Sequence, residues 1–222
     1  MIDTQYLSTD NQTAIDAGAD ALKRGELVVF PTDTVYGIGA HAFQPHAIDA
    51  LYHAKIRSRL KGIPILVSDA GQVERLTATA LTPPVERLLA RFWPGALTII
   101  VSRHPSLPAN IAPNDKVAVR MPDCAPALAL IAAAGGAVAA TSANLSSEPP
   151  ALSGDEALRL FNNRVAVVLD GGTAAGGVPS TIIDCSTEPF TVVREGPISA
   201  ETIFATLTQE TATERGSRPA NL

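Results

Sequence analysis

The sequence predicts one α/β domain built on a mixed β-sheet, and three observations lead to this class. Short apolar runs typical of buried strands alternate with amphipathic stretches typical of helices along the 222 residues. Hydrophobic residues make up 46% of the chain and only 5% are aromatic, so aliphatic side chains must fill a substantial core. Because no internal repeat or central linker interrupts this pattern, we expect a single domain over residues 1–207 and a polar, disordered tail over residues 208–222.

Apolar spacing and stop signals predict the helices. Ala, Ile and Leu recur at helical spacing over residues 13–24, and Gly25 is placed as the C-terminal stop. A second helix begins with Pro45 in its first turn and leads to a basic stretch. Further helices are expected over residues 73–76, 85–92, 125–134, 155–161 and 199–207.

Aliphatic runs predict the strands between these helices. They are expected over residues 27–30, 63–67, 96–101, 117–119, 137–140, 165–169, 182–183 and 190–193. Pro64 restricts its strand to the edge of the sheet or to a strand start. After the first strand, the segment PTDTVYGIGA is predicted to be a loop rich in hydroxyls and small residues.

Composition and motifs exclude several classes of protein. A net charge of −5 argues against binding nucleic acid by bulk electrostatics, although it leaves a local tRNA contact open. Cys124 and Cys185 form no CxxC motif, so we expect reduced thiols rather than disulfides or a zinc site. The segment MIDTQYLSTD lacks the regions of a signal peptide, and no apolar run reaches the ~20 residues of a membrane span. We therefore expect a soluble, cytoplasmic protein with no membrane partner.

A basic stretch lies near the middle of this pattern, with no acidic residue between Asp49 and Asp69. Four cations alternate along it: Lys55, Arg57, Arg59 and Lys61. If the backbone is extended, alternate side chains share one face, and all four cations can converge on one anion. A solvated basic loop is the alternative.

Polar clusters occur where several predicted strands end or begin. They comprise residues 31–34, Arg120, residues 141–144, residues 180–181 and Arg194. Hydroxyls, an amide and cations bind anions and polar small molecules, and phosphates or carboxylates suit them. The alternatives are turn hydroxyls that satisfy backbone groups and arginines in surface ion pairs. No P-loop or dinucleotide-binding motif is present, and the four histidines are expected to be structural or surface residues.

Seven motifs in order resemble one family. They are PTDTVYGIGA, KIRSRLKG, FWPGALTIIV, VAVRMPD, TSANLSSEPP, STIIDCS and VVREGPIS, and they are similar to those of the YrdC/TsaC family of L-threonylcarbamoyladenylate synthases over residues 13–204. The resemblance implies a three-layer α/β (α+β) fold, with helices packed on a twisted mixed sheet that lines a basic cavity, in a member of the single-domain kind. It also implies a nucleotidyltransferase that makes threonylcarbamoyl-AMP and pyrophosphate from L-threonine, bicarbonate or CO2, and ATP. The product serves threonylcarbamoyladenosine modification of tRNA through a threonylcarbamoyl-transfer complex.

The same resemblance implies roles for individual residues. The catalytic set comprises Lys55, Arg57, Ser142 and Asn144; the threonine-binding set Thr34, Arg120 and Ser180; and the ATP-binding set Arg57, Lys61, Ser142, Asn144 and Arg194. Thr32 is a weaker candidate with a structural alternative, and no role maps to Arg59. Mg2+ is expected to arrive on the triphosphate of ATP, without a protein-bound metal. Ser58 and Gly62 stand where the family often has proline, which leaves the register of this loop on the phosphates open.

Two other functions remain open from the sequence. One is a non-catalytic RNA-binding member of the same fold, for double-stranded RNA, tRNA or ribosome maturation. Loss of Lys55, Ser142 or Asn144 would favour it, and all three are present. The other is a paralogue with a different acceptor, because threonine and serine pockets differ by one methyl group, worth about 1–3 kcal/mol.

Overall fold

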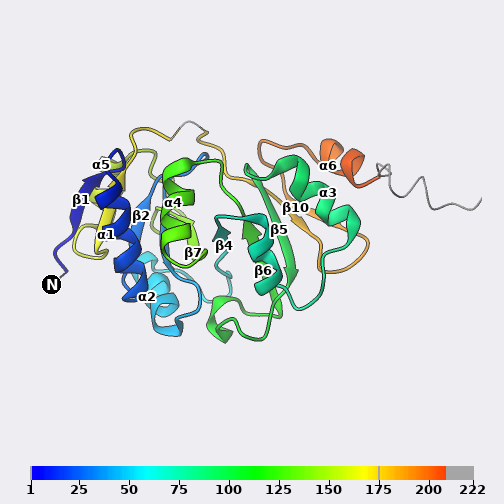
Figure 1. The fold of residues 1–222 in the computed structure, drawn as a ribbon, viewed down its shortest axis with the longest axis horizontal. Coiled ribbons are helices and arrows are strands. Elements are labelled where there is room, and N and C mark those ends of the chain that lie inside the picture. The colour runs from blue at the N-terminus through cyan, green and yellow to red at the C-terminus, as the bar shows by residue number, and fades with distance from the viewer. Residues whose placement is uncertain (1, 175, 209–222) are drawn as a thin grey trace, which may run out of the picture.

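A mixed β-sheet runs through the described part of the chain (Figure 1). The structure is a computed structural model that describes residues 2–174 and 176–208. Its strands are β1 (Gln5–Ser8), β2 (Val28–Phe30), β3 (Gly37–His41), β4 (Ile65–Val67), β5 (Leu97–Ser102), β6 (Lys116–Arg120), β7 (Ala137–Ser142), β8 (Val167–Asp170), β9 (Thr181–Asp184) and β10 (Thr191–Arg194). Their order across the sheet is β1-β8-β2-β3-β7-β4-β6-β5-β9-β10. Parallel and antiparallel pairs both occur, so the predicted mixed sheet is confirmed.

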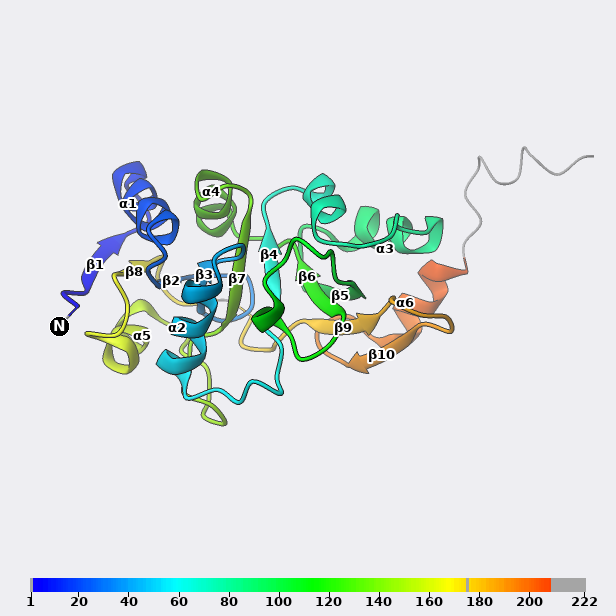
Figure 2. The same cartoon turned by 90° about the horizontal axis from the view of Figure 1, so that it is seen from below.

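Helices cover both faces of this sheet. The α-helices are α1 (Gln12–Lys23), α2 (Pro45–Lys55), α3 (Pro83–Phe92), α4 (Ala125–Ala133), α5 (Gly154–Phe161) and α6 (Ala200–Leu207), with 3-10 turns η1 (Ala70–Arg75) and η2 (Ala109–Ile111). Figure 2 shows α1, α4 and α3 along one face and α2 and α5 on the other, while α6 packs against α3 near β10. The result is the three-layer α/β arrangement that the family resemblance implies. None of the described helices is long and apolar enough to cross a membrane.

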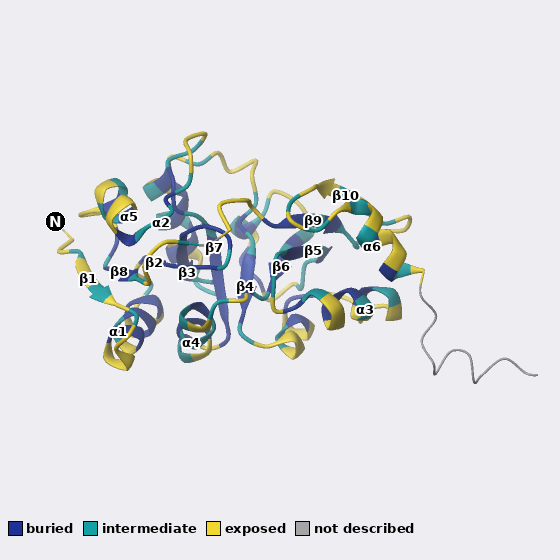
Figure 3. Ribbon diagram, turned by 90° about the horizontal axis from the view of Figure 1, so that it is seen from above, coloured by how far each residue is buried: buried dark blue, intermediate teal, exposed yellow. Residues whose placement is uncertain are grey.

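Aliphatic side chains fill the space on both sides of the sheet. In β2, Val28 and Phe30 pack with residues of α1 and α4, whereas the intervening Val29 packs in the cluster on the opposite face. All three side chains are buried, which explains why β2 is an unbroken apolar run rather than an alternating one. Figure 3 shows buried central strands and exposed outer faces on the helices.

One segment predicted to be a loop is instead a strand in the middle of the sheet. Gly37–His41 forms β3, which pairs antiparallel with β2 and with β7, and Gly37 lies opposite Ser142. A Cβ on Gly39 would lie 2.7 Å from Val138 and 2.8 Å from Phe30, so this close approach of strands requires glycine. A small residue such as Gly39, which in the sequence indicates a loop, is therefore needed here because neighbouring side chains leave no room for a Cβ.

Other elements differ from expectation in smaller ways. The polar strand β1 was not predicted, and the expected helix over residues 73–76 is the 3-10 turn η1. Pro64 directly precedes β4, which lies between β7 and β6, so it marks a strand start rather than an edge. Of the predicted tail, Thr208 caps α6 and residues 209–222 lie outside the described residues.

The basic stretch is not extended, contrary to the sequence-based hypothesis. Lys55 is the last residue of α2, and Ile56 follows in the left-handed conformation with φ 53°. The N–H of Ile56 donates to the carbonyl of His53 at 3.1 Å, and the N–H of Arg57 donates to that of Tyr52 at 3.0 Å. This is a helix-ending motif that usually contains glycine, so alternate side chains do not share a face.

Ile56→Gly should stabilise the protein by about 1 kcal/mol. A β-branched residue in the left-handed region costs about 1–2 kcal/mol, which exceeds the entropic cost of a glycine. Little packing is lost, because Ile56 is 73% exposed. Urea denaturation of both proteins measures the difference. Ile56→Ala keeps a Cβ and serves as the control; a glycine variant no more stable than this alanine variant would contradict the strain argument.

Candidate functional site

Lys55 joins the end of α2 to the turn that follows β7. Its side chain is buried, and its ammonium donates to the carbonyl of Ser142, to the carbonyl of Asn144 at 2.6 Å and to Oδ1 of Asn144 at 3.3 Å. Ser142 Oγ donates to the same Oδ1 at 2.5 Å. The amide Nδ2 of Asn144 donates to the carbonyls of Leu145 and Glu148, both at 2.8 Å. Three of the four residues predicted to be catalytic are therefore in one hydrogen-bonded group.

Burial determines the electrostatics of this lysine. Desolvation lowers the pKa of Lys55 from 10.5 to about 7, and the charge of Arg57 contributes in the same direction. Three oxygen acceptors match the three N–H groups of an ammonium. In this structure Lys55 therefore uses its donors on the protein.

The other three cations of the basic stretch lie outside this hydrogen-bonded group. Arg57 is half-buried, which lowers its pKa, and it donates from Nε to the carbonyl of Lys61 at 3.1 Å and from Nη2 to that of Gly62 at 2.8 Å. Arg59 is exposed and bonds Asp49 at 2.7 Å, and Lys61 is exposed. The four cations do not converge on one anion, so that hypothesis is wrong for this structure. Arg57 fixes the loop over residues 56–62, whereas Lys61 extends into solvent.

A second group of site residues surrounds Arg120 at the end of β6. The guanidinium donates from Nε to the carbonyl of Gly95 at 2.9 Å and from Nη1 to Oγ1 of Thr34 at 2.9 Å. Its Nη2 lies 2.6 Å from both carboxylate oxygens of Asp33. Burial lowers the pKa of Arg120, and the carboxylate of Asp33 opposes that shift. The structure thus brings the predicted residues Thr34 and Arg120 together.

Ser180 and Arg194 form a third group next to Arg120. Ser180 Oγ lies 2.7 Å from Oγ1 of Thr98, and Arg194 donates from Nη2 to the carbonyl of Ser180 at 2.7 Å. Burial lowers the pKa of Arg194, and the charge of Arg120 lowers it further. Guanidinium groups with hydroxyls beside them favour an anionic ligand.

The loop over residues 32–36 connects these groups, even though their strands do not end at the same edge. β4 pairs parallel with β6 and antiparallel with β7, so Arg120 and Ser142 end strands of opposite direction. From this loop, Thr34 reaches Arg120, while the carbonyl of Tyr36 accepts a bond from the N–H of Ala143 at 2.7 Å. Thr32 Oγ1 donates to the carbonyl of Val35 at 2.6 Å, which supports its structural alternative.

Sequence reasoning missed two residues of the site. Asp33 lies inside the PTDT motif and within the polar cluster of residues 31–34, but only the threonines of that cluster were given roles. Thr98 is a buried polar residue between Leu97 and Ile99 on β5, and a hydroxyl within an apolar strand was the available signal.

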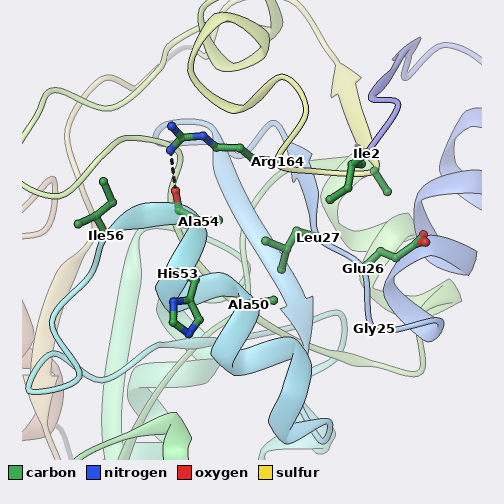
Figure 4. Close-up of a pocket in the computed structure, with 10 residues that line it drawn as sticks. Ile2, Gly25, Glu26, Leu27, Ala50, His53, Ala54, Ile56 and Arg164 are labelled. Carbon is green, nitrogen blue, oxygen red and sulfur yellow. Dashed lines mark hydrogen bonds between the residues drawn. The ribbon is translucent and has the colours of Figure 1, made fainter.

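A cavity of about 660 Å³ lies elsewhere, between α2, the start of β2 and residues 164–166 (Figure 4). In Figure 4 the guanidinium of Arg164 bonds the carbonyl of Ala54, and Ile56 lies at one side. Its described lining residues include no hydroxyl or amide side chain and none of the predicted site residues. We therefore assign the site to the polar groups and not to this cavity.

The described residues contain no group of three or more His, Cys, Asp or Glu side chains that could hold a metal ion. Arginines, hydroxyls and one amide instead dominate the candidate site. Such groups bind the phosphate and carboxylate parts of a ligand directly.

Residues 20–196 match the model of the Sua5/YciO/YrdC family, which is described as "Telomere recombination". The chain belongs to this family. The resemblance inferred from the seven motifs is therefore confirmed, and with it the fold class.

Relatives in this family extend the comparison. A threonylcarbamoyl-AMP synthase of Bacillus subtilis is 39% identical over 92% of this chain and 59% of its own length. A putative threonylcarbamoyl-AMP synthase of Mycobacterium tuberculosis is 38% identical over 87% of this chain and 88% of its own length. The crystal structure of Pyrococcus abyssi Sua5 complexed with L-threonine matches with a TM-score of 0.87 and 33% identity, covering 92% of this chain. The chain spans only about three-fifths of the B. subtilis and P. abyssi proteins.

Lys55 should make stability rise with pH above neutrality. Its folded pKa of about 7 lies below the unfolded value of 10.5, so between these values unfolding takes up a proton. The free energy of unfolding gains up to about 1.4 kcal/mol per pH unit from this group, and the gain is absent below pH 7. Lys55→Met should remove this slope. Urea denaturation of both proteins from pH 7.5 to 9 measures it, and identical slopes would show that Lys55 is not the titrating group.

Proposed function

We propose that this chain is an L-threonylcarbamoyladenylate synthase, which makes threonylcarbamoyl-AMP and pyrophosphate from L-threonine, bicarbonate or CO2, and ATP. The observation that carries the proposal is that guanidinium groups lie beside hydroxyls, since Arg120 donates to Oγ1 of Thr34 at 2.9 Å and Nη2 of Arg194 lies 3.4 Å from Oγ of Ser180. Relatives named threonylcarbamoyl-AMP synthase at 38–39% identity support it. So does the complex of the P. abyssi relative with L-threonine.

The reaction requires anions to be held together. The amine of threonine attacks CO2 to give a carbamate and loses a proton, and the carbamate oxygen then attacks the α-phosphate of ATP as pyrophosphate leaves. Both substrates carry negative charge, so fixed cations lower the cost of their approach. We assign the threonine to Thr34, Arg120 and Ser180, and the ATP to Arg57, Lys61, Ser142, Asn144 and Arg194.

Lys55 has a different task in this proposal. Its three donors already bond the turn after β7, so we assign it to positioning Ser142 and Asn144 rather than to contact with substrate. When Lys55 is protonated, its side chain also contributes a fixed positive charge beside the turn after β7. Arg57 holds the loop that carries Lys61, and its remaining N–H groups are available to phosphate.

Partners and location follow from the same proposal. The product would pass to a threonylcarbamoyl-transfer complex that modifies an adenosine of tRNA. The reaction would take place in the cytoplasm, where the two free cysteines, Cys124 and Cys185, stay reduced. Mg2+ would enter as part of the ATP substrate.

Pyrophosphate release should require all three substrates. With ATP, L-threonine and bicarbonate together, release is expected well above background, and omission of any one should abolish it. A coupled pyrophosphate assay measures the rate. Release that is equal without threonine would refute the proposal, and release with serine in place of threonine would identify a paralogue. A chain that binds RNA but releases no pyrophosphate would favour the non-catalytic alternative.

Arg57→Ala should lower the rate of pyrophosphate release at least tenfold, because the loop loses its anchor and the phosphates lose a bidentate donor. Arg59→Ala is the matched control in the same loop. Its exposed pair with Asp49 contributes little, so its rate should stay within about twofold of the wild-type rate. If both variants lost the same fraction of the rate of pyrophosphate release, the rate would depend on the total charge of the loop and not on Arg57 itself.

A further inference from the structure

The ion pair between Asp33 and Arg120 has no role in the function proposed above. Both oxygens of Asp33 lie 2.6 Å from Nη2 of Arg120, and the two side chains are 17% and 8% exposed. Replacement of buried ion pairs by apolar residues is often neutral or stabilising, so stability alone does not account for this pair. Its position next to Thr34, inside the candidate site, suggests recognition of a ligand.

The charges around this pair have a distinctive arrangement. Asp33 pairs with Arg120, and Nη1 of the same guanidinium donates to Oγ1 of Thr34 at 2.9 Å. A carboxylate and a guanidinium group therefore lie side by side next to a hydroxyl. The complement of such an arrangement is a molecule that carries a cation and an anion a short distance apart. A free α-amino acid has this form.

Asp33 also retains capacity for a further donor. A carboxylate offers about four lone-pair directions, and Nη2 of Arg120 contacts one on each oxygen. The Asp33 side chain is more exposed than that of Arg120, so a ligand can reach it.

The backbone around Asp33 is fixed. The N–H of Gly177 donates to the carbonyl of Thr34 at 2.8 Å, and a Cβ on Gly176 would lie 2.6 Å from the carbonyl oxygen of Asp33. Gly176 and Gly177 therefore pack directly against the backbone of Asp33 and Thr34, which keeps the carboxylate of Asp33 beside Arg120.

We propose that Asp33 is a specificity-determining residue that accepts hydrogen bonds from the α-ammonium group of the amino acid, while Arg120 binds its α-carboxylate. The inference rests on the proposed function, because it describes how the amino acid substrate of that site is recognised. An α-hydroxy acid of the same shape keeps the carboxylate but has no cation for Asp33. The site therefore selects amino acids against hydroxy acids.

Calorimetric binding of two ligands tests this selection. L-threonine and its α-hydroxy analogue, 2,3-dihydroxybutyrate of matching configuration, are titrated with and without a non-hydrolysable ATP analogue. Wild-type protein should prefer threonine by at least about tenfold, as expected for a hydrogen bond between charged groups. Asp33→Asn should bind threonine at least about tenfold more weakly and show almost no preference. Asp33→Glu keeps the charge and should retain a preference for threonine.

A surface carboxylate provides the matched control. Asp115 pairs with Arg103 at 3.3 Å and is fully exposed, so Asp115→Asn should leave both affinities unchanged. Circular dichroism checks that each variant is folded. If Asp33→Asn does not fold, the wild-type preference and Asp33→Glu still decide the matter.

Any one of the following results would overturn the inference. Equal wild-type affinity for the two ligands would do so without any variant. Equal weakening of both ligands in folded Asp33→Asn would make Asp33 only a structural partner of Arg120. Tighter binding of both would make Asp33 an internal competitor for the ligand carboxylate. If the wild-type protein binds threonine but the preference persists in Asp33→Asn, this inference fails alone; if it binds neither ligand, the proposed function fails as well.

Discussion

The buried ammonium of Lys55 is the contact on which the rest of the site depends. Lys55 is the last residue of α2. Its ammonium donates to two backbone carbonyls and to the amide oxygen of Asn144 in the turn after β7, and these bonds fix Ser142 and Asn144. The same turn also holds the 32–36 loop, because the N–H of Ala143 donates to the carbonyl of Tyr36. In that loop, the hydroxyl of Thr34 accepts a hydrogen bond from Arg120. A helix end and a strand end thus share one charged group, and the loop joins them through a backbone hydrogen bond. Burial works against this charge, as the lowered pKa of Lys55 indicates.

The α/β class with a mixed sheet was predictable because its signals are local, whereas the three layers were implied by the family resemblance. Apolar runs such as β2 and the helical spacing of α1 depend on neighbours in sequence, and they gave the class and most of the elements. β3 was not predictable in this way, because Gly39 is required by Phe30 and Val138 across two strand contacts. The conformation of the basic stretch was also missed, since an isoleucine occupies the place where a helix usually ends with glycine.

The residue types of the candidate site were accessible from sequence, whereas their grouping was not. Thr34, Arg120, Ser180 and Arg194 could be selected as polar residues at strand ends. Which of them touch depends on strand direction and on a loop that crosses between opposite edges of the sheet. Asp33 was overlooked because its charge opposes the cations, and only the ion pair with Arg120 makes it relevant.

The pairing of Gly37 with Ser142 gives the β3–β7 register a functional meaning. Strand side chains alternate between faces, so a slip of β3 by one residue along β7 would turn the side chains of β3 to the opposite side of the sheet. The same slip would shift the 32–36 loop relative to the turn that Lys55 holds. Strand alignment is thus part of the site geometry, and a single-residue insertion in β3 would displace the 32–36 loop from the turn after β7.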